Sequence, residues 1–268
     1  MGKILEVDNF EFSYNKKVII DNISFSVSSG SINAIIGANN SGKTTLIKAL
    51  AGNLIYSKSI KIDDVSFTKF NRLEYLKRCD VIYLSSNKKL KFDNLKMLLR
   101  YQLQSRGYSL RSANKRIVEF LKTFDASELH KSKISKLNSF NKAKALLIAA
   151  AIHEPKVLFA DDLFEGLNYN ECMLISDMLV KIKKMGISVV FTANRLDACI
   201  NSDSIYFISD AKLEKYDNLE TLIKRDNVLS RNGIIIPPML DLSQKLKDYD
   251  VLDQIIYTPE RMVDTLWK

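Results

Sequence analysis

The segment at residues 37–44, Gly-Ala-Asn-Asn-Ser-Gly-Lys-Thr, constrains the fold of this chain more than any other feature. Glycines at this spacing let the backbone curl so that successive N–H groups point inward, and a following helix adds its positive end. A lysine here reaches the β- and γ-phosphates of a nucleotide, and the next hydroxyl can ligate Mg²⁺. The spacing therefore predicts a site for ATP and Mg²⁺. The predicted nucleotide-binding residues of the loop are Asn39, Asn40, Ser41, Gly42, Lys43, Thr44 and Thr45.

The surroundings of this loop favour a phosphate site over a chance glycine turn with an exposed lysine. The apolar run 32–36 predicts a buried strand that ends at the loop. Residues 44–52 follow with apolar positions on one side, which predicts a helix. Strand, glycine loop and helix are the order in which this motif binds phosphate.

Short apolar strands alternate with helices along most of the chain, which indicates a largely parallel sheet covered on both faces. Residues 93–152 show several helical patterns and no strand, so we expect a helical lobe at about 88–152. After residue 226 the alternation of strands and helices stops, and two short helices are expected, each preceded by proline. We predict an ATP-binding domain at 1–225 and a helical extension at 226–268. Further expected strands are 4–12, 18–27, 81–84, 157–160, 187–192 and 205–208, and further expected helices are 139–152, 170–185, 240–246 and 260–266.

Two carboxylates follow the short apolar strand 157–160. Ligands of open parallel sheets gather at the carboxyl ends of the strands. We expect Asp161 to hold Mg²⁺ together with Thr44. Asp162 can orient or deprotonate an attacking water, or it can cap the segment that follows, and the sequence leaves both readings open.

Composition excludes some classes of protein. With 46% hydrophobic and 26% charged residues the chain is expected to pack as a globule. It lacks the roughly 18 consecutive apolar residues of a membrane span, and no secretory signal is visible. The three cysteines are expected to be buried thiols. The net charge of +9 is best explained by a solvated face. Proximity to an anionic lipid surface is the second explanation, and binding of nucleic acid is the third.

Together these motifs resemble those of the ATP-binding cassette (ABC) ATPases, over nearly the whole chain. The resemblance implies a phosphate-loop α/β fold with antiparallel N-terminal strands. It also implies that Tyr14 stacks on adenine, although this residue can equally be an ordinary strand residue. The matching segments are Phe12-Ser13-Tyr14, the phosphate loop 37–45, the glutamine-loop position 85–87, the signature position 137–141, the second carboxylate motif 157–162, the interface loop 165–168 and the switch position 192–194.

The sequence departs from the family pattern at the positions that align water and close the dimer. The resemblance implies catalytic roles at Asp162, Asn194 and Ser86, where the family has glutamate, histidine and glutamine. The partner-site signature, Leu-Ser-Gly-Gly-Gln in the family, is altered at Asn138, Ser139, Phe140 and Asn141. The aspartate shortens the carboxylate reach by about 1.5 Å. These changes favour a weakly hydrolysing partner in an ATPase heterodimer.

The C-terminal residues are similar to the extension of ATPase subunits of energy-coupling factor (ECF) transporters. The similar segments are 236–238, 241–246 and 258–263. This implies a dimerisation element and a location on the cytoplasmic face of the membrane. The implied partners are a second ATPase subunit, a transmembrane coupling subunit and a substrate-binding membrane subunit, with uptake of a small solute such as a vitamin or metal ion; nucleic acid is not expected. The alternatives are a non-transport ABC ATPase acting on DNA or the ribosome, and a nucleotide-sensing partner without turnover.

Overall fold

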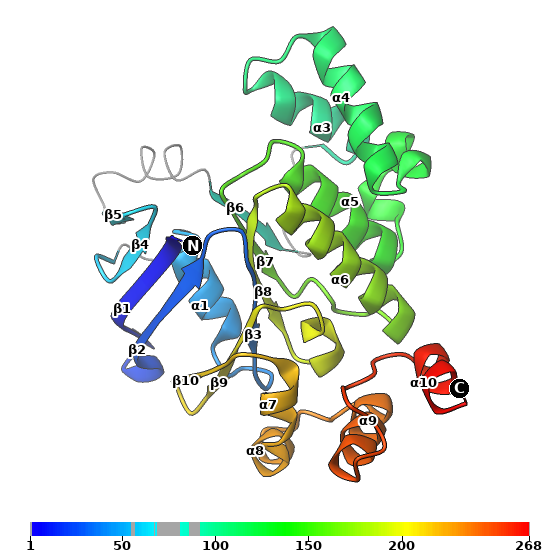
Figure 1. Cartoon of the computed structure of the whole chain (residues 1–268). Helices are drawn as coiled ribbons and strands as arrows, with labels where there is room; N and C mark the ends of the chain where they lie inside the picture. Colours follow the sequence, from blue (N-terminus) through cyan, green and yellow to red (C-terminus); the bar gives the residue numbers. More distant parts are fainter. Residues whose placement is uncertain (1, 55–56, 67, 69–80, 86–91, 268) are drawn as a thin grey trace.

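Two β-sheets and the helices around them make up the chain, as seen in a computed structural model that describes residues 2–54, 57–66, 68, 81–85 and 92–267 (Figure 1). The larger sheet has the strand order β10-β9-β3-β8-β7-β6. Its strands are β3 (Ile32–Ile36), β6 (Val81–Ser85), β7 (Val157–Asp161), β8 (Ser188–Ala193), β9 (Ser204–Ser209) and β10 (Lys212–Tyr216).

The central strands of this sheet run parallel, from β9 through β3, β8 and β7 to β6, while β10 pairs antiparallel at the edge. Every residue of β3, β7 and β8 is buried. Such continuous apolar runs are expected where helices or a second layer cover both faces of a sheet. The carboxyl ends of these strands therefore meet at one edge, where the phosphate loop leaves β3.

The smaller sheet is antiparallel and has the order β2-β1-β4-β5. Its strands are β1 (Lys3–Tyr14), β2 (Lys17–Ser28), β4 (Ile60–Ile62) and β5 (Val65–Ser66). Helix α1 (Lys43–Leu50) lies between the two sheets in Figure 1. Its buried leucines and isoleucine share one core with both sheets, so the helix that follows the phosphate loop is fixed from two sides.

Three helices and two short 3₁₀ turns occupy residues 95–151, where the helical lobe was expected. They are α3 (Leu95–Gln104), α4 (Leu110–Thr123), the turns Ser127–Lys131 and Ile134–Lys136, and α5 (Ser139–Ala151). Each α-helix begins at a polar cap: Asn94, Ser109 and Asn138 accept from backbone N–H groups of the first turn. Helix α6 (Tyr169–Lys184) packs beside α5.

The C-terminal residues form four short helices, which lie below the larger sheet and to its right in Figure 1. They are α7 (Leu219–Ile223), α8 (Asp226–Arg231), α9 (Pro238–Asp248) and α10 (Pro259–Leu266). Proline at the first position of α9 and of α10 suits a helix start, because its missing N–H needs no partner there. Leu252, Ile256 and Met262 form a small core of their own.

The predicted α/β fold class is confirmed, and the expected strands and helices are present to within a few residues at their ends. The prediction missed β4, β5, β10, α7 and α8, which have two to six residues each and lack the continuous apolar run that marks β3 and β7. Cys172 and Cys199 are free, buried thiols as expected, and Cys79 lies outside the described residues. No helix in the described part of the chain is long and apolar enough to cross a membrane.

Candidate functional site: a nucleotide cleft

The loop between β3 and α1 has the tight backbone that its glycines predicted. A side chain at Gly37 would place its Cβ 2.4 Å from the carbonyl oxygen of Ile208, so only glycine fits there. Gly42 caps α1 with a positive φ of 105°. Asn40 also has a positive φ, 64°, a conformation that asparagine tolerates better than most residues. The sequence predicts Asn40 as a binding residue but gives no sign of this backbone role.

Lys43 is buried inside the curl of the loop, with only 6% of its surface exposed. Its Nζ donates to the carbonyl oxygens of Gly37 at 2.9 Å and Ala38 at 2.7 Å. Burial lowers the pKa of Lys43, and the carboxylates of Asp162 and Asp161 act in the opposite direction. The Ser41 hydroxyl is buried without a hydrogen-bond partner among the described residues. A buried ammonium and an unpaired hydroxyl in one loop suit an incoming phosphate.

The loop opens into a cleft of about 720 Å³. Most of the predicted binding residues line it, and so do Lys17 and Ile19, which the sequence analysis did not single out. The lining residues are Lys17, Ile19, Asn39, Asn40, Gly42, Lys43, Thr44, Thr45, Asp162, Phe164, Glu165, Thr192, Ala193 and Asn194.

Tyr14 ends β1 opposite Lys17, its cross-strand partner. Its ring is 46% exposed and stands edge-on to Phe12, with 4.7 Å between the ring centroids. Tyr14 is therefore exposed and is not a lining residue of the cleft, but its cross-strand partner Lys17 is.

Three hydroxyl groups converge on the carboxylate of Asp161, which is 3% exposed at the end of β7. Thr192 donates to Oδ1 at 2.8 Å and Thr44 to the same oxygen at 3.2 Å, while the Tyr83 hydroxyl donates to Oδ2 at 3.0 Å. Burial and the neighbouring Asp161 raise the pKa of Tyr83, which keeps its proton on the phenol. The pairing of Thr44 with Asp161 supplies the hard oxygen ligands that Mg²⁺ prefers. Sequence reasoning did not single out Tyr83 and did not predict the contact of Thr192 with Asp161, because only strand pairing brings these side chains together.

Asp162 follows directly in a left-handed conformation, with φ of 52°. Its backbone N–H donates to the Thr192 hydroxyl at 2.9 Å, so Thr192 joins both aspartates. The side chain lines the cleft. Partial burial raises the pKa of Asp162, and the charges of Asp161 and Glu165 act in the same direction. A carboxylate with a raised pKa beside a phosphate site can accept a proton from water.

Two further residues, Asn194 and Ser86, are predicted to be catalytic. Asn194 is exposed at the cleft, and its Nδ2 donates to Oδ1 of Asn39 at 3.4 Å, across from the phosphate loop. Ser86 lies outside the described residues.

The four residues at the signature position start helix α5. Asn138 is its cap and accepts from the N–H of Asn141 at 2.9 Å. Ser139 lies beside Gly166 of the interface loop, because a Cβ on that glycine would come 3.1 Å from the serine hydroxyl. Phe140 is half-buried against the main core of this same chain. Only part of the Phe140 side chain is therefore accessible at the signature position.

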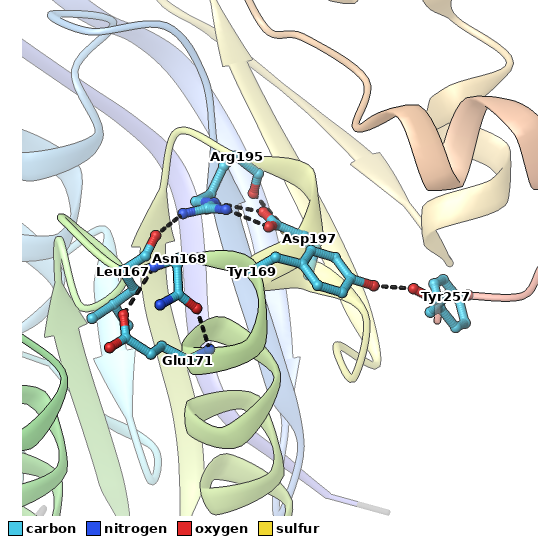
Figure 2. Close-up of polar contacts among 8 residues, drawn as sticks. Leu167, Asn168, Tyr169, Glu171, Arg195, Asp197 and Tyr257 are labelled. Atoms are coloured by element: carbon cyan, nitrogen blue, oxygen red, sulfur yellow. Dashed lines mark hydrogen bonds and ion pairs between the residues drawn. The ribbon is translucent and has the colours of Figure 1, made fainter. Parts of the chain in front are cut away.

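A polar network holds the end of the interface loop and the start of α6, as Figure 2 shows. Arg195 pairs with the buried Asp197 through Nε at 2.6 Å and a terminal nitrogen at 2.5 Å. Its other terminal nitrogen donates to the carbonyl oxygen of Leu167. Asn168 and Glu171 form a reciprocal capping box at the start of α6. The hydroxyl of Tyr169 donates to the backbone carbonyl of Tyr257 in the C-terminal extension.

A parallel sheet whose buried strand β3 runs into this lysine-bearing loop, with a carboxylate at the end of β7 two strands away, defines a phosphate-loop nucleoside triphosphatase. The family model described as "ABC transporter" matches residues 20–165, more than half of the sequence. The chain belongs to the ABC transporter family, and it is an ATPase by this membership.

Proteins of known class are similar to this chain over most of its length. The energy-coupling factor transporter ATP-binding proteins EcfA1 of Streptococcus mutans and Oenococcus oeni are each 23% identical over 271 residues. The alignments cover 99% of this chain and 97% and 98% of those proteins. Among solved structures, cbiO1 from Clostridium perfringens, described as part of the ABC transporter complex cbiONQ, superposes with a TM-score of 0.74 at 19% identity. That match covers 86% of this chain and 94% of the other.

Proposed function

We propose that this protein is an ATP-binding subunit of an ECF-type membrane transporter, in which it drives uptake of a small solute such as a vitamin or metal ion. The observation that carries the proposal is the full-length similarity to the EcfA1 proteins, which includes the C-terminal extension as well as the nucleotide cleft. The vitamin or metal ion is the transported cargo, which another subunit selects.

In this proposal the loop residues 39–45 bind the phosphates of ATP, Lys43 neutralises part of their charge, and Tyr14 stacks on adenine. Thr44 and Asp161 would hold Mg²⁺, whose charge offsets that of the phosphates. The fit rests on the 3.2 Å contact between these two side chains. Asp162 positions the water whose oxygen attacks the γ-phosphorus, and it accepts a proton from that water. The bond from that phosphorus to the β–γ bridging oxygen breaks, which gives ADP and inorganic phosphate.

We further propose that the chain hydrolyses ATP slowly and pairs with a more regular ATPase subunit. In the family each site combines the carboxylate of one subunit with the signature of the other. Two copies of this chain would place Asp162 opposite Asn138 and Ser139 in both sites. A heterodimer leaves one site with a regular carboxylate and a second with a regular signature, so it preserves one part of the machinery in each.

The remaining partners follow from the transporter proposal. The chain would dock on the cytoplasmic face of the membrane, on a transmembrane coupling subunit that also carries a substrate-binding subunit. Support comes from the similar structure of cbiO1, which is described as part of the ABC transporter complex cbiONQ. The net charge of +9 suits a site next to anionic lipid headgroups.

Affinity purification of the tagged chain from detergent-solubilised membranes tests this function. We expect a second ATPase subunit and two membrane proteins to be recovered with it. Recovery with ribosomes or DNA instead would favour a non-transport ABC ATPase and overturn the proposal. Single-turnover hydrolysis by the purified chain tests the heterodimer part separately: turnover at the rate of an ordinary family member would remove it.

A further inference from the structure

Arg195 joins two parts of the molecule that the sequence places far apart. It stands directly after Asn194, at the end of the strand that carries Thr192. Its guanidinium uses two nitrogens on Asp197 and a third on the carbonyl oxygen of Leu167, in the interface loop 165–168. Figure 2 shows this fork between the loop and the turn at Asp197.

The two ends of this contact are firmly held. The Asp197 side chain is only 2% exposed, whereas that of Arg195 is 31% exposed. A buried carboxylate with a two-nitrogen partner fixes the plane of the guanidinium, because arginine presents its donors in a rigid fork. Leu167 is itself buried in the main core. The third nitrogen therefore has a fixed acceptor in the loop, the carbonyl oxygen of Leu167.

The segment 192–197 also contacts the nucleotide cleft. Thr192 contacts the carboxylate of Asp161 and the N–H of Asp162, and Asn194 contacts Asn39 of the phosphate loop. Thr192, Asn194 and Arg195 thus contact the predicted metal carboxylate, the phosphate loop and the interface loop, respectively. All three contacts arise within four consecutive residues of backbone.

We propose that Arg195 is a positioning residue, which holds the interface loop in a fixed place relative to the nucleotide cleft by binding the carbonyl of Leu167 from Asp197. The contact holds in the chain alone, and its consequence, alignment of the loop with a partner ATPase subunit, rests on the proposed function. Arg195 acts through the backbone of the loop and not on the nucleotide.

The test compares two arginines that each pair with a carboxylate and donate to a backbone carbonyl, although Asp197 is 2% exposed and Glu154 is 52% exposed. Arg116 in the helical lobe also pairs with a carboxylate, Glu154 at 2.7 Å, and donates to a backbone carbonyl, that of Ile152 at 3.1 Å. Its side chain is 27% exposed, close to that of Arg195. The variant Arg195→Met with Asp197→Asn leaves no charged carboxylate unpaired, and Arg116→Met with Glu154→Gln is its matched control.

Hydrogen–deuterium exchange of the full chain without nucleotide measures the effect. We expect the amides of residues 166–169 to exchange at least about threefold faster in the Arg195 pair of substitutions, while the Arg116 pair leaves them unchanged. Arg195→Lys, which retains a cation opposite Asp197, should also speed this exchange, because one ammonium cannot reproduce the planar fork. This variant serves if the double variant fails to fold. Unchanged exchange at 166–169 in the folded variants would overturn the proposal.

A second measurement separates positioning from general damage. Because Arg195 is not part of the cleft lining, ATP affinity by calorimetry should stay within about twofold of the parent, while single-turnover hydrolysis falls about fivefold. A parallel loss of ATP affinity would contradict the assigned role. If the parent chain itself bound no ATP, the proposed function would fail. The exchange experiment uses the chain without nucleotide, so it would still test the role of Arg195 independently.

Discussion

The floor of the nucleotide cleft and the surface around the interface loop differ in how their side chains are held. We call Lys43, Thr192 and the adjoining Asp161 the floor. All three are buried and have defined hydrogen-bond partners. Around the interface loop, Asn138, Ser139 and Asn194 are exposed. The buried residues keep the types of the family pattern, whereas the exposed Asn138, Ser139 and Asn194 depart from it, as do the half-buried Asp162 and Phe140. The departures thus lie where side chains are at least partly accessible to a partner.

The largest expected effect breaks the floor of the cleft. Lys43→Ala removes an ammonium that would contact phosphate, and a hydrogen bond to a charged group contributes about 1.5–3 kcal/mol. We expect ATP affinity, measured by calorimetry, to fall by about tenfold to a hundredfold. Lys61→Ala, at an exposed lysine of β4, is the control. Equal affinity in parent and Lys43→Ala would remove the assignment of the cleft.

The next largest effect concerns the rate of hydrolysis at a position that departs from the family pattern. Asp162→Glu restores the reach of the carboxylate, and misplacement on the ångström scale can cost about a hundredfold in rate. Because Asn194 keeps its altered side chain, we expect a rise of only about tenfold in single-turnover hydrolysis, with ATP affinity unchanged. Asp253→Glu, at an exposed aspartate of the extension, should have no effect. A rate that does not rise would mean that Asp162 does not position the water.

A smaller effect concerns stability on the floor. Thr192→Val keeps the side-chain shape but removes the hydroxyl that joins Asp161 to the N–H of Asp162. Leaving a buried group unpaired costs about 1–3 kcal/mol, so urea unfolding should show a loss in that range. The same change at the exposed Thr265 of α10 should cost less than about 0.5 kcal/mol. Equal losses at both positions would argue against a special role for Thr192.

The smallest effect depends on pH. The pKa of Asp162 is raised in the folded chain, chiefly by burial, so its contribution to stability is complete below the unfolded pKa of about 3.9 and is lost as pH rises through the folded pKa. Asp162→Asn removes the charge that burial disfavours. Its melting temperature relative to the parent should therefore increase between pH 4 and pH 7. A relative melting temperature that stays constant across this window would contradict the direction of the shift.

The fold class could be predicted because short apolar strands alternate with helices along the chain. The strand at 32–36, the loop and helix α1 occur where their pattern placed them, and Asp161 ends β7 as expected. What escaped prediction depends on contacts between distant segments. Tyr83 reaches Asp161 only because β6 pairs with β7, and Arg195 reaches Leu167 only through a turn after β8. The roles assigned to the site residues stay predictions, including that of Ser86.

The tail contact of Tyr169 has a consequence for how the extension can change in evolution. Its acceptor is the main-chain oxygen at position 257, which every amino acid possesses. Substitution of residue 257 itself therefore leaves the acceptor in place. An insertion or deletion between α9 and α10 would move that oxygen away, so the length of this connecting segment is constrained more strongly than the identity of the residue.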